Sequence, residues 1–245
     1  MSHAEERLAN DPTSELWGEH RARYRFASQF VNGDRVLDIA CGAGFGLEML
    51  EEANAWAVGV DYDREALGDV RRRLPTTRLV RADGMRLPFN GGSFETVVSF
   101  ETLEHVTDAS ALVFELRRVL RPGGYLVLST PNRSFGPQDQ HTANKFHIRE
   151  FTANELYDCL NECFAEVRLY GQRPSSTYKY VPFLMHESRY VVSELMWKTM
   201  TRLPFILKNR LALSISGRPF YPGESDYRFE PDATRGSHVL VAVAR

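Results

Sequence analysis

The feature that most constrains the fold is a short apolar strand that runs directly into a glycine-rich turn. Residues 35–39 read Arg-Val-Leu-Asp-Ile, residues 42–46 read Gly-Ala-Gly-Phe-Gly, and residues 47–53 have a helical composition. Glycine lets a backbone turn tightly and approach a ligand closely. A strand, a glycine turn and a helix in this order are typical of an open α/β sheet that binds its ligand at the carboxyl ends of the strands.

Strands and helices continue to alternate after this turn. Helices are expected over 64–74 and around 112–120, and a capping box at Thr152-Ala-Asn-Glu155 opens another. With 35–39, the predicted strands are 56–60, 77–82, 96–100, 125–130, 166–170 and 238–244. Nearly all of their residues are apolar, as expected when both faces of a parallel sheet are covered. The pattern predicts an α/β fold with a seven-stranded, mostly parallel sheet and helices on both faces.

The length of 245 residues suits a single domain. We expect a helix over 15–31 laid against the main body, a core over 34–173 and the last strand over 236–245. Residues 174–235 are far too many for an ordinary loop. We therefore predict that they form an insertion, a cap or lid, before the last strand.

Charge and cysteine content indicate the partners and the cellular compartment of the protein. The formal net charge is −2, so no global basic field recruits nucleic acid, and no nucleic-acid partner is expected. Three cysteines favour a reducing compartment. The first residues are polar and acidic and have no apolar signal core. Together these observations predict a cytoplasmic protein.

The residues around the glycine turn indicate the charge of the ligand. A dinucleotide-binding turn would need a third glycine where this chain has Leu47. Asp38 lies four residues before Gly42, and a carboxylate beside a pyrophosphate is unfavourable. The same carboxylate suits a ligand with sulfonium and ammonium charges. A nicotinamide oxidoreductase is therefore disfavoured.

The segment 36–44, Val-Leu-Asp-Ile-Ala-Cys-Gly-Ala-Gly, resembles the first motif of class I S-adenosylmethionine-dependent methyltransferases, although Ala40 stands where that family usually has glycine. The resemblance implies a Rossmann-like class I methyltransferase fold with S-adenosylmethionine as cofactor. It also implies that Asp61 holds the ribose hydroxyls and that Asp83 lies near the adenine amino group. The predicted cofactor-binding residues are Tyr24, Asp38, Ala40, Gly42, Gly44, Asp61, Tyr62, Asp83, Gly84, Met85 and Phe100.

Three ionisable residues, Glu101, Glu104 and His105, follow the strand 96–100, and His147 follows the next strand. One interpretation is a hard-cation site for Mg²⁺ with Glu101, Glu104, His105 and His147 as ligands. The second is metal-free catalysis in which a histidine removes a proton, with His105, His147 and Glu101 as catalytic candidates. In the third, Glu104 and His105 serve only capping and packing. The Glu-x-x-Glu-His pattern is similar to the metal site of plant small-RNA 2′-O-methyltransferases and to ubiquinone-pathway O-methyltransferases.

Further segments resemble methyltransferases associated with bacterial surface polysaccharides and other glycans. They are residues 20–27, 99–105, 129–132, 144–147 and 170–173. This resemblance implies O-methylation of a small-molecule or sugar hydroxyl. The alternatives are N- or C-methylation of an amino sugar or a quinone-like ring, and a non-catalytic scaffold that merely holds the cofactor. The intact set of Glu101, Glu104 and His105 argues against the scaffold.

The insertion contains a basic and apolar stretch, residues 195–223, that has no acidic residue. One interpretation is a lid over the acceptor site that meets an anionic acceptor or makes peripheral contact with a membrane. The other is a cap packed on the domain or a homodimer face, with its basic residues balanced by the acids at 224, 226, 230 and 232.

Overall fold

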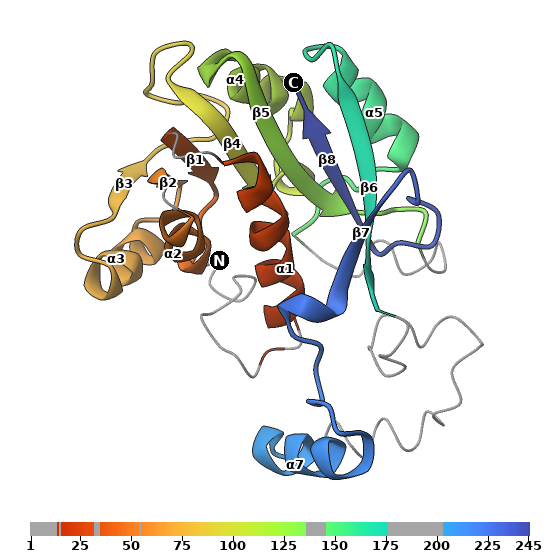
Figure 1. Cartoon of the computed structure of the whole chain (residues 1–245). Helices are drawn as coiled ribbons and strands as arrows, with labels where there is room; N and C mark the ends of the chain where they lie inside the picture. Colours follow the sequence, from red (N-terminus) through yellow and green to blue (C-terminus); the bar gives the residue numbers. More distant parts are fainter. Residues whose placement is uncertain (1–13, 15, 32–34, 54, 136–145, 176–202) are drawn as a thin grey trace.

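Figure 1 shows the computed structural model, which describes residues 14, 16–31, 35–53, 55–135, 146–175 and 203–245. Its strands form one sheet in the order β3-β2-β1-β4-β5-β8-β6-β7. Their bounds are Arg35–Ile39 (β1), Trp56–Asp61 (β2), Arg78–Arg81 (β3), Phe94–Phe100 (β4), Leu120–Pro131 (β5), Val167–Pro174 (β6), Tyr227–Pro231 (β7) and Val239–Ala244 (β8). Strands β1 to β5 pair in parallel, whereas β8 runs antiparallel to both β5 and β6. The chain therefore has the predicted α/β fold with a mostly parallel sheet.

The sheet has eight strands where the sequence predicted seven, because β7 was assigned to the insertion. It pairs antiparallel with β6, with Tyr170 opposite Pro231. Tyr227 is buried while Arg228 and Glu230 are exposed, as in a strand with one covered face. Outward charges and a terminal proline are also usual in an edge strand, where they block further pairing. Because β7 has only five residues, its alternation of buried and exposed side chains does not stand out in the sequence.

Helices cover both faces of the sheet. Their bounds are Trp17–Ala27 (α1), Phe45–Glu52 (α2), Arg64–Arg73 (α3), Ala109–Val119 (α4), Ala153–Asn161 (α5) and Phe205–Ser216 (α7), with short 3-10 turns at Ser28–Phe30 (η2), Leu103–His105 (η3) and Glu224–Asp226 (η6). Asp63 and Asp108 cap the amino ends of α3 and α4 through their side chains. The predicted capping box at Thr152 and Glu155 opens α5.

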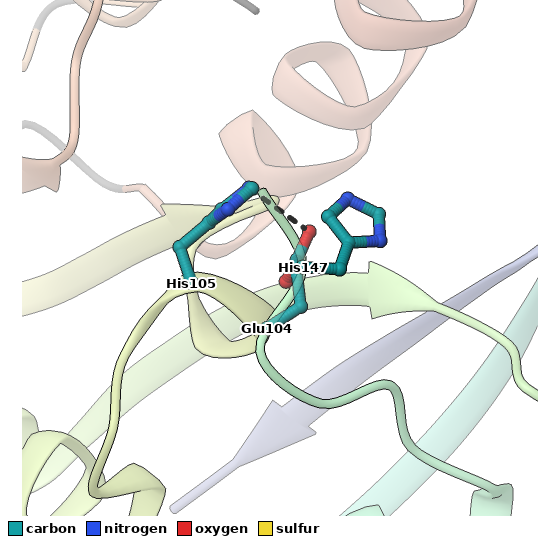
Figure 2. Close-up of side chains that lie close together, drawn as sticks. All are labelled: Glu104, His105 and His147. Carbon is teal, nitrogen blue, oxygen red and sulfur yellow. Dashed lines mark ion pairs between the residues drawn. The ribbon is translucent and has the colours of Figure 1, made fainter. Parts of the chain in front are cut away.

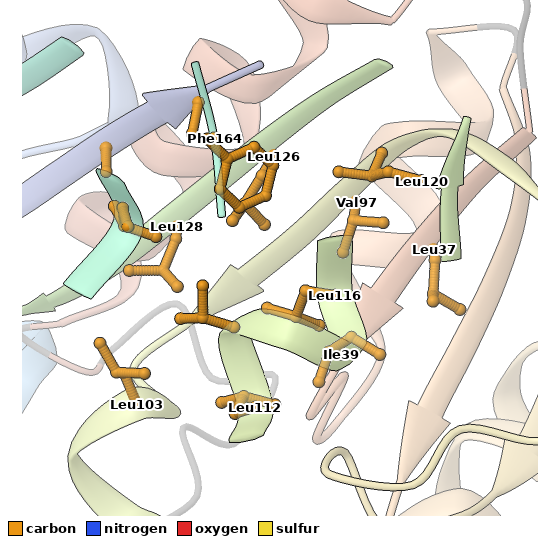
Figure 3. Close-up of a cluster of buried hydrophobic side chains, with 14 of the residues drawn as sticks. Leu37, Ile39, Val97, Leu103, Leu112, Leu116, Leu120, Leu126, Leu128 and Phe164 are labelled. Carbon is orange, nitrogen blue, oxygen red and sulfur yellow. The ribbon is translucent and has the colours of Figure 1, made fainter. Parts of the chain in front are cut away.

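Alternate strand residues enter two separate hydrophobic cores. On one face, Leu37, Val97 and Leu126 pack with side chains from α4 and α5, the cluster drawn in Figure 3. On the other face, Val36, Val98 and Val127 pack with residues of α1, α2 and α3. The alternation follows from the two-residue period of a strand. Because both faces are covered, only the ends of the strands remain open to a ligand.

Helix α1 is held against the sheet by the chain segment just before β7. Gly18 lies so close to this segment that an added Cβ would sit 2.0 Å from the carbonyl oxygen of Pro222. Arg21 and Arg25 both form ion pairs with Glu224. Phe26 stacks on Phe229 of β7, with ring centroids 4.4 Å apart. The predicted N-terminal helix is thus fixed by residues that lie near the other end of the chain.

Much of the predicted insertion 174–235 lies outside the described residues, including Lys198 and Arg202 of the basic stretch. The described part contains α7, whose Ile206, Leu207, Leu211 and Leu213 are exposed. Lys208 is buried instead, and its ammonium group donates a hydrogen bond to the Tyr221 hydroxyl at 2.8 Å. Within the described ranges, no helix is both long and apolar enough to cross a membrane.

Candidate functional site

A cavity of about 300 Å³ opens at the carboxyl ends of β1 and β2. Its lining includes Ile39, Val60 and Leu112 as apolar walls. Six of the predicted cofactor-binding residues also line it: Ala40, Asp61, Tyr62, Asp83, Gly84 and Met85. They come from three separate segments of the chain, and the parallel sheet brings them to one edge. His105 lines the same cavity.

Asp61 connects the glycine turn to the turn after β2. Its carboxylate accepts hydrogen bonds from the backbone N–H of Gly42 at 2.9 Å and of Asp63 at 2.8 Å. Two backbone donors hold the carboxylate in place at the end of β2. The Asp83 carboxylate is exposed and accepts a hydrogen bond from the N–H of Met85 at 2.9 Å. Both acids are therefore oriented by the backbone beside the cavity and retain acceptor capacity for ligand hydroxyl or amino groups.

The glycine turn uses left-handed backbone conformations at alternate residues. The φ angles of Ala40, Gly42 and Gly44 are 57°, 51° and 73°. Gly44 precedes α2, and an added Cβ there would lie 2.7 Å from a methyl group of Val70. Ala40 adopts the left-handed conformation with a Cβ, at a position where glycine has no such steric cost. The backbone at Ala40, where the family motif has glycine, is therefore strained.

Asp38, Tyr24 and Phe100 lie beneath the glycine turn and not in the lining of this cavity. The Tyr24 hydroxyl donates to the Asp38 carboxylate, 3.2 and 3.1 Å from its two oxygens. The Tyr24 ring meets Phe100 edge-on, with centroids 4.9 Å apart, and presses against Gly46. Burial raises the pKa of Asp38 to about 8, although the hydrogen bond from Tyr24 acts in the opposite direction. A nearby cationic ligand would favour the ionised carboxylate.

Glu101 pairs with an arginine that is not among the site residues predicted from the sequence. Arg23 of α1 is buried, and its guanidinium lies 2.8 Å from carboxylate oxygens of both Glu19 and Glu101. Ser129 donates a hydrogen bond to the same Glu101 oxygen at 2.7 Å. Glu101 has a φ of 49°, which is unusual for a residue with a side chain. Arg23 falls within the family-like segment 20–27, but its pattern gave no sign of this partner.

Glu104, His105 and His147 form a compact cluster beside the cavity. One ligand atom of each lies within 4.8 Å of the others, and Glu101 is not part of this group. Figure 2 shows the Glu104 carboxylate directed between the two imidazole rings, whose centroids are 5.0 Å apart. Glu104 is completely buried, and burial together with the Glu101 charge raises its pKa well above the usual range. The structure thus brings together three of the four residues predicted as metal ligands.

The segment 129–132 supports this cluster from β5. Thr130 donates its hydroxyl proton to Glu104 at 2.9 Å, while Ser129 bonds to Glu101. Asn132 donates to the carbonyl oxygens of Thr234 and Ser237 and thereby ties the end of β5 to the segment before β8. In the sequence, these residues stand out only through their family resemblance. The Ser129 hydroxyl bonds to Glu101 and the Thr130 hydroxyl bonds to Glu104, so each glutamate has its own partner on β5.

Comparisons with known proteins show which proteins the chain resembles in sequence. A sequence profile described as a methyltransferase domain matches residues 37–128. A probable S-adenosylmethionine-dependent methyltransferase of Mycolicibacterium smegmatis is 36% identical over 149 residues, which cover 60% of this chain and 58% of the relative. A ubiquinone biosynthesis O-methyltransferase of Aromatoleum aromaticum is 34% identical over 114 residues, covering 42% of this chain and 46% of the relative. This chain therefore spans less than two thirds of the length of either relative.

A solved structure agrees at the level of the fold. The S-adenosylmethionine-dependent methyltransferase of Archaeoglobus fulgidus superposes with a TM-score of 0.62 over 94% of each chain, at 18% identity. The matched profile covers β1 to β5, including the glycine turn and the acids at the ends of β2 and β3. Residues 37–128 therefore match a methyltransferase domain, and the fold of the chain is that of an S-adenosylmethionine-dependent methyltransferase.

Proposed function

We propose that this protein transfers a methyl group to a hydroxyl oxygen of a small molecule or a sugar. S-adenosylmethionine, the cofactor of the family, supplies the methyl group when bound. The observation that carries the choice of oxygen is the position of His105, which lines the cavity together with Asp61 and Asp83 and also belongs to the cluster with Glu104 and His147. Proton-accepting groups therefore lie next to the proposed cofactor pocket.

The residues of the cavity fit the proposed cofactor. Asp61 and Asp83 offer carboxylate oxygens to ribose hydroxyls and to an adenine amino group, and the apolar side chains of Ile39, Val60 and Leu112 offer contact to a base. Asp38 is buried beneath the turn, and a ligand with sulfonium and ammonium groups would favour its ionised carboxylate. Positioning of acceptor and donor is expected to contribute most of the catalysis.

A hydroxyl acceptor requires a means of losing its proton, and the cluster beside the cavity supports one. Imidazole groups are the commonest proton acceptors in enzymes, and Glu101, His105 and His147 are the proposed catalytic residues. A cation held by the cluster would serve the same end, because it lowers the pKa of a bound hydroxyl. A neutral amine acceptor would need neither a proton-accepting histidine nor a bound cation. The name of the Aromatoleum relative, an O-methyltransferase, supports oxygen as the acceptor atom.

The proposal is tested with S-adenosylmethionine carrying a labelled methyl group and a panel of phenols, glycosides, sugar nucleotides and amines. We expect labelled O-methyl product, identified by mass spectrometry, and a loss of about 10²- to 10⁴-fold in kcat for His105→Ala. Tyr157→Ala is the control, since Tyr157 is an exposed ring on α5 outside the cluster and should leave turnover unchanged.

Three results would contradict the proposal. Label found only on nitrogen or carbon would favour the amino-sugar or quinone-ring alternative. Cofactor binding without transfer to any acceptor would favour a scaffold. Full turnover of His105→Ala and His147→Ala on a hydroxyl acceptor would remove both imidazoles from the reaction.

A further inference from the structure

The cluster of Glu104, His105 and His147 has the hydrogen bonds of a built ligand set. His105 Nδ1 lies 3.1 Å from the carbonyl oxygen of Phe146, and His147 Nδ1 lies 2.8 Å from a carboxylate oxygen of Glu150. Both partners accept hydrogen bonds, so Nδ1 is the donor in each ring. In the neutral ring that donates through Nδ1, Nε2 is the nitrogen that can bind a metal ion. Metal-binding histidines characteristically donate their other N–H to a carbonyl or a carboxylate in this way.

Glu104 provides a second and independent observation. Its Oε2 accepts the hydrogen bond from Thr130, but its Oε1 has no hydrogen-bond partner among the described residues, although the side chain is completely buried. A buried carboxylate oxygen without a partner is costly. This oxygen lies 3.8 Å from Nε2 of His105, and Figure 2 shows the carboxylate directed toward both rings. A cation bound between these groups would satisfy it.

The backbone holds the three donors in one place. The N–H groups of Ile148 and Arg149 both donate to the carbonyl oxygen of Glu104, at 2.8 and 3.2 Å. The segment that carries His147 is therefore tied directly to the turn that carries the other two residues. The three ligand atoms lie within 4.8 Å of one another, and bonds of ~2.1 Å to a tetrahedral ion would bring them to ~3.4 Å. The three side chains therefore need to move only slightly closer together to bind one ion.

We infer that Glu104, His105 and His147 form a binding site for a transition-metal dication of the Zn²⁺ or Fe²⁺ class. Two imidazole nitrogens and one carboxylate suit such ions, whereas Mg²⁺ prefers oxygen ligands throughout. The proposed site omits Glu101, which the sequence predicts as a fourth ligand of Mg²⁺, because Glu101 is engaged by Arg23 and Ser129. Three protein ligands leave at least one coordination position open, and His105 places it beside the cavity.

Direct metal binding tests this site without reference to the acceptor, so its failure is distinct from failure of the proposed methyl transfer. The protein is stripped with a chelator and titrated with Zn²⁺ by calorimetry and with Co²⁺ by visible absorption. We expect one equivalent of each ion to bind, with Co²⁺ bands typical of four or five ligands. His105→Ala and His147→Ala should each weaken binding about 100-fold or more, since loss of a supporting partner alone costs about 10- to 100-fold.

Two further variants keep the test decisive if a ligand variant folds poorly. Glu150→Ala removes only the acceptor of the His147 N–H and should weaken binding about 10- to 100-fold. Glu101→Gln should retain full affinity for Zn²⁺. The inference is overturned if no equivalent of Zn²⁺ or Co²⁺ binds, if Mg²⁺ alone binds, if the histidine variants bind Zn²⁺ as the natural chain does, or if Glu101→Gln abolishes binding.

Discussion

The Tyr24 hydroxyl of helix α1 lies 3.2 and 3.1 Å from the two carboxylate oxygens of Asp38 at the end of β1. This hydrogen bond joins the N-terminal helix to the acid of the glycine motif, and both side chains are buried. The same tyrosine ring presses on Gly46, where any side chain would collide with it. The N-terminal helix is therefore part of the structure that supports the glycine turn.

Asp38 should make stability depend on pH in a defined direction. Its pKa is raised by burial from 3.8 to about 8. Below pH 3.8 the folded and unfolded states are both protonated. Between these two values the unfolded chain loses the proton that the folded protein retains, so this group lowers the free energy of unfolding by ~1.4 kcal/mol per pH unit. Above pH 8 both states are ionised and the loss stops growing.

Asp38→Asn removes this titration and keeps an acceptor for Tyr24. We expect the variant, measured by denaturant unfolding without cofactor, to gain stability relative to the natural chain as pH rises from 5 to 8. A difference between the two proteins that stays constant over this range would show that Asp38 does not keep its proton in the folded state.

Ala40→Gly should stabilise the protein. Ala40 has a φ of 57°, and the left-handed conformation costs a residue with a Cβ ~1–2 kcal/mol. The greater freedom of glycine in the unfolded chain offsets ~0.4–1 kcal/mol of this gain. The net effect should appear as a higher Tm. Gly44→Ala is the opposite control, because it introduces both a strained φ and a contact with Val70. A lower Tm for Ala40→Gly would contradict the strain argument.

Asp61→Ala should weaken binding of S-adenosylhomocysteine by ~1.5–3 kcal/mol, since it removes a charged acceptor for the ribose hydroxyls. Calorimetry measures the affinity, and thermal unfolding without ligand separates this loss from damage to the turn that Asp61 also supports. Asp69→Ala, at an exposed acid on α3, should bind as the natural chain does. An unchanged affinity of Asp61→Ala would remove this residue from the cofactor site.

Arg23→Ala should be strongly destabilising, by ~3–5 kcal/mol, because it leaves the carboxylates of Glu19 and Glu101 without their buried partner. Arg21→Ala on the same helix breaks only a partly exposed ion pair with Glu224 and should cost at most ~1 kcal/mol. Chemical denaturation of the two variants provides the comparison. Equal losses would mean that the buried pair adds nothing beyond a surface contact.

The exposed apolar side chains of α7 should mediate contact with a membrane surface. We expect the protein to sediment with vesicles that contain anionic lipid and to lose this association when Ile206 and Leu207 are changed to serine. Gel filtration of the same variants reveals whether the helix instead joins two copies of the chain. Vesicle binding unaffected by these changes would exclude α7 as the contact.

The sheet, the glycine turn and the acids beside it can be predicted from the amino-acid sequence alone. Local properties carry these features: short strands that are almost wholly apolar, glycines at positions of positive φ, and acids at strand ends, Asp61 as the last residue of β2 and Asp83 shortly after β3. Parallel strands bring their carboxyl ends to one edge whatever the rest of the chain does, so the residues at these ends could be assigned to one site. The short edge strand β7 was missed because its few residues gave too weak a pattern.

The partner of each ionisable group, by contrast, depends on how distant segments pack in the folded chain. Glu101 and Glu104 are three residues apart and looked equivalent in sequence, yet one pairs with Arg23 and the other faces His105 and His147. Their partners come from α1, β5 and the segment after β5, and no local pattern links these segments. Burial makes an unpaired charge costly, so packing of distant segments selects the pairs. The chemistry at the end of β4 therefore depends on contacts that exist only in the folded chain.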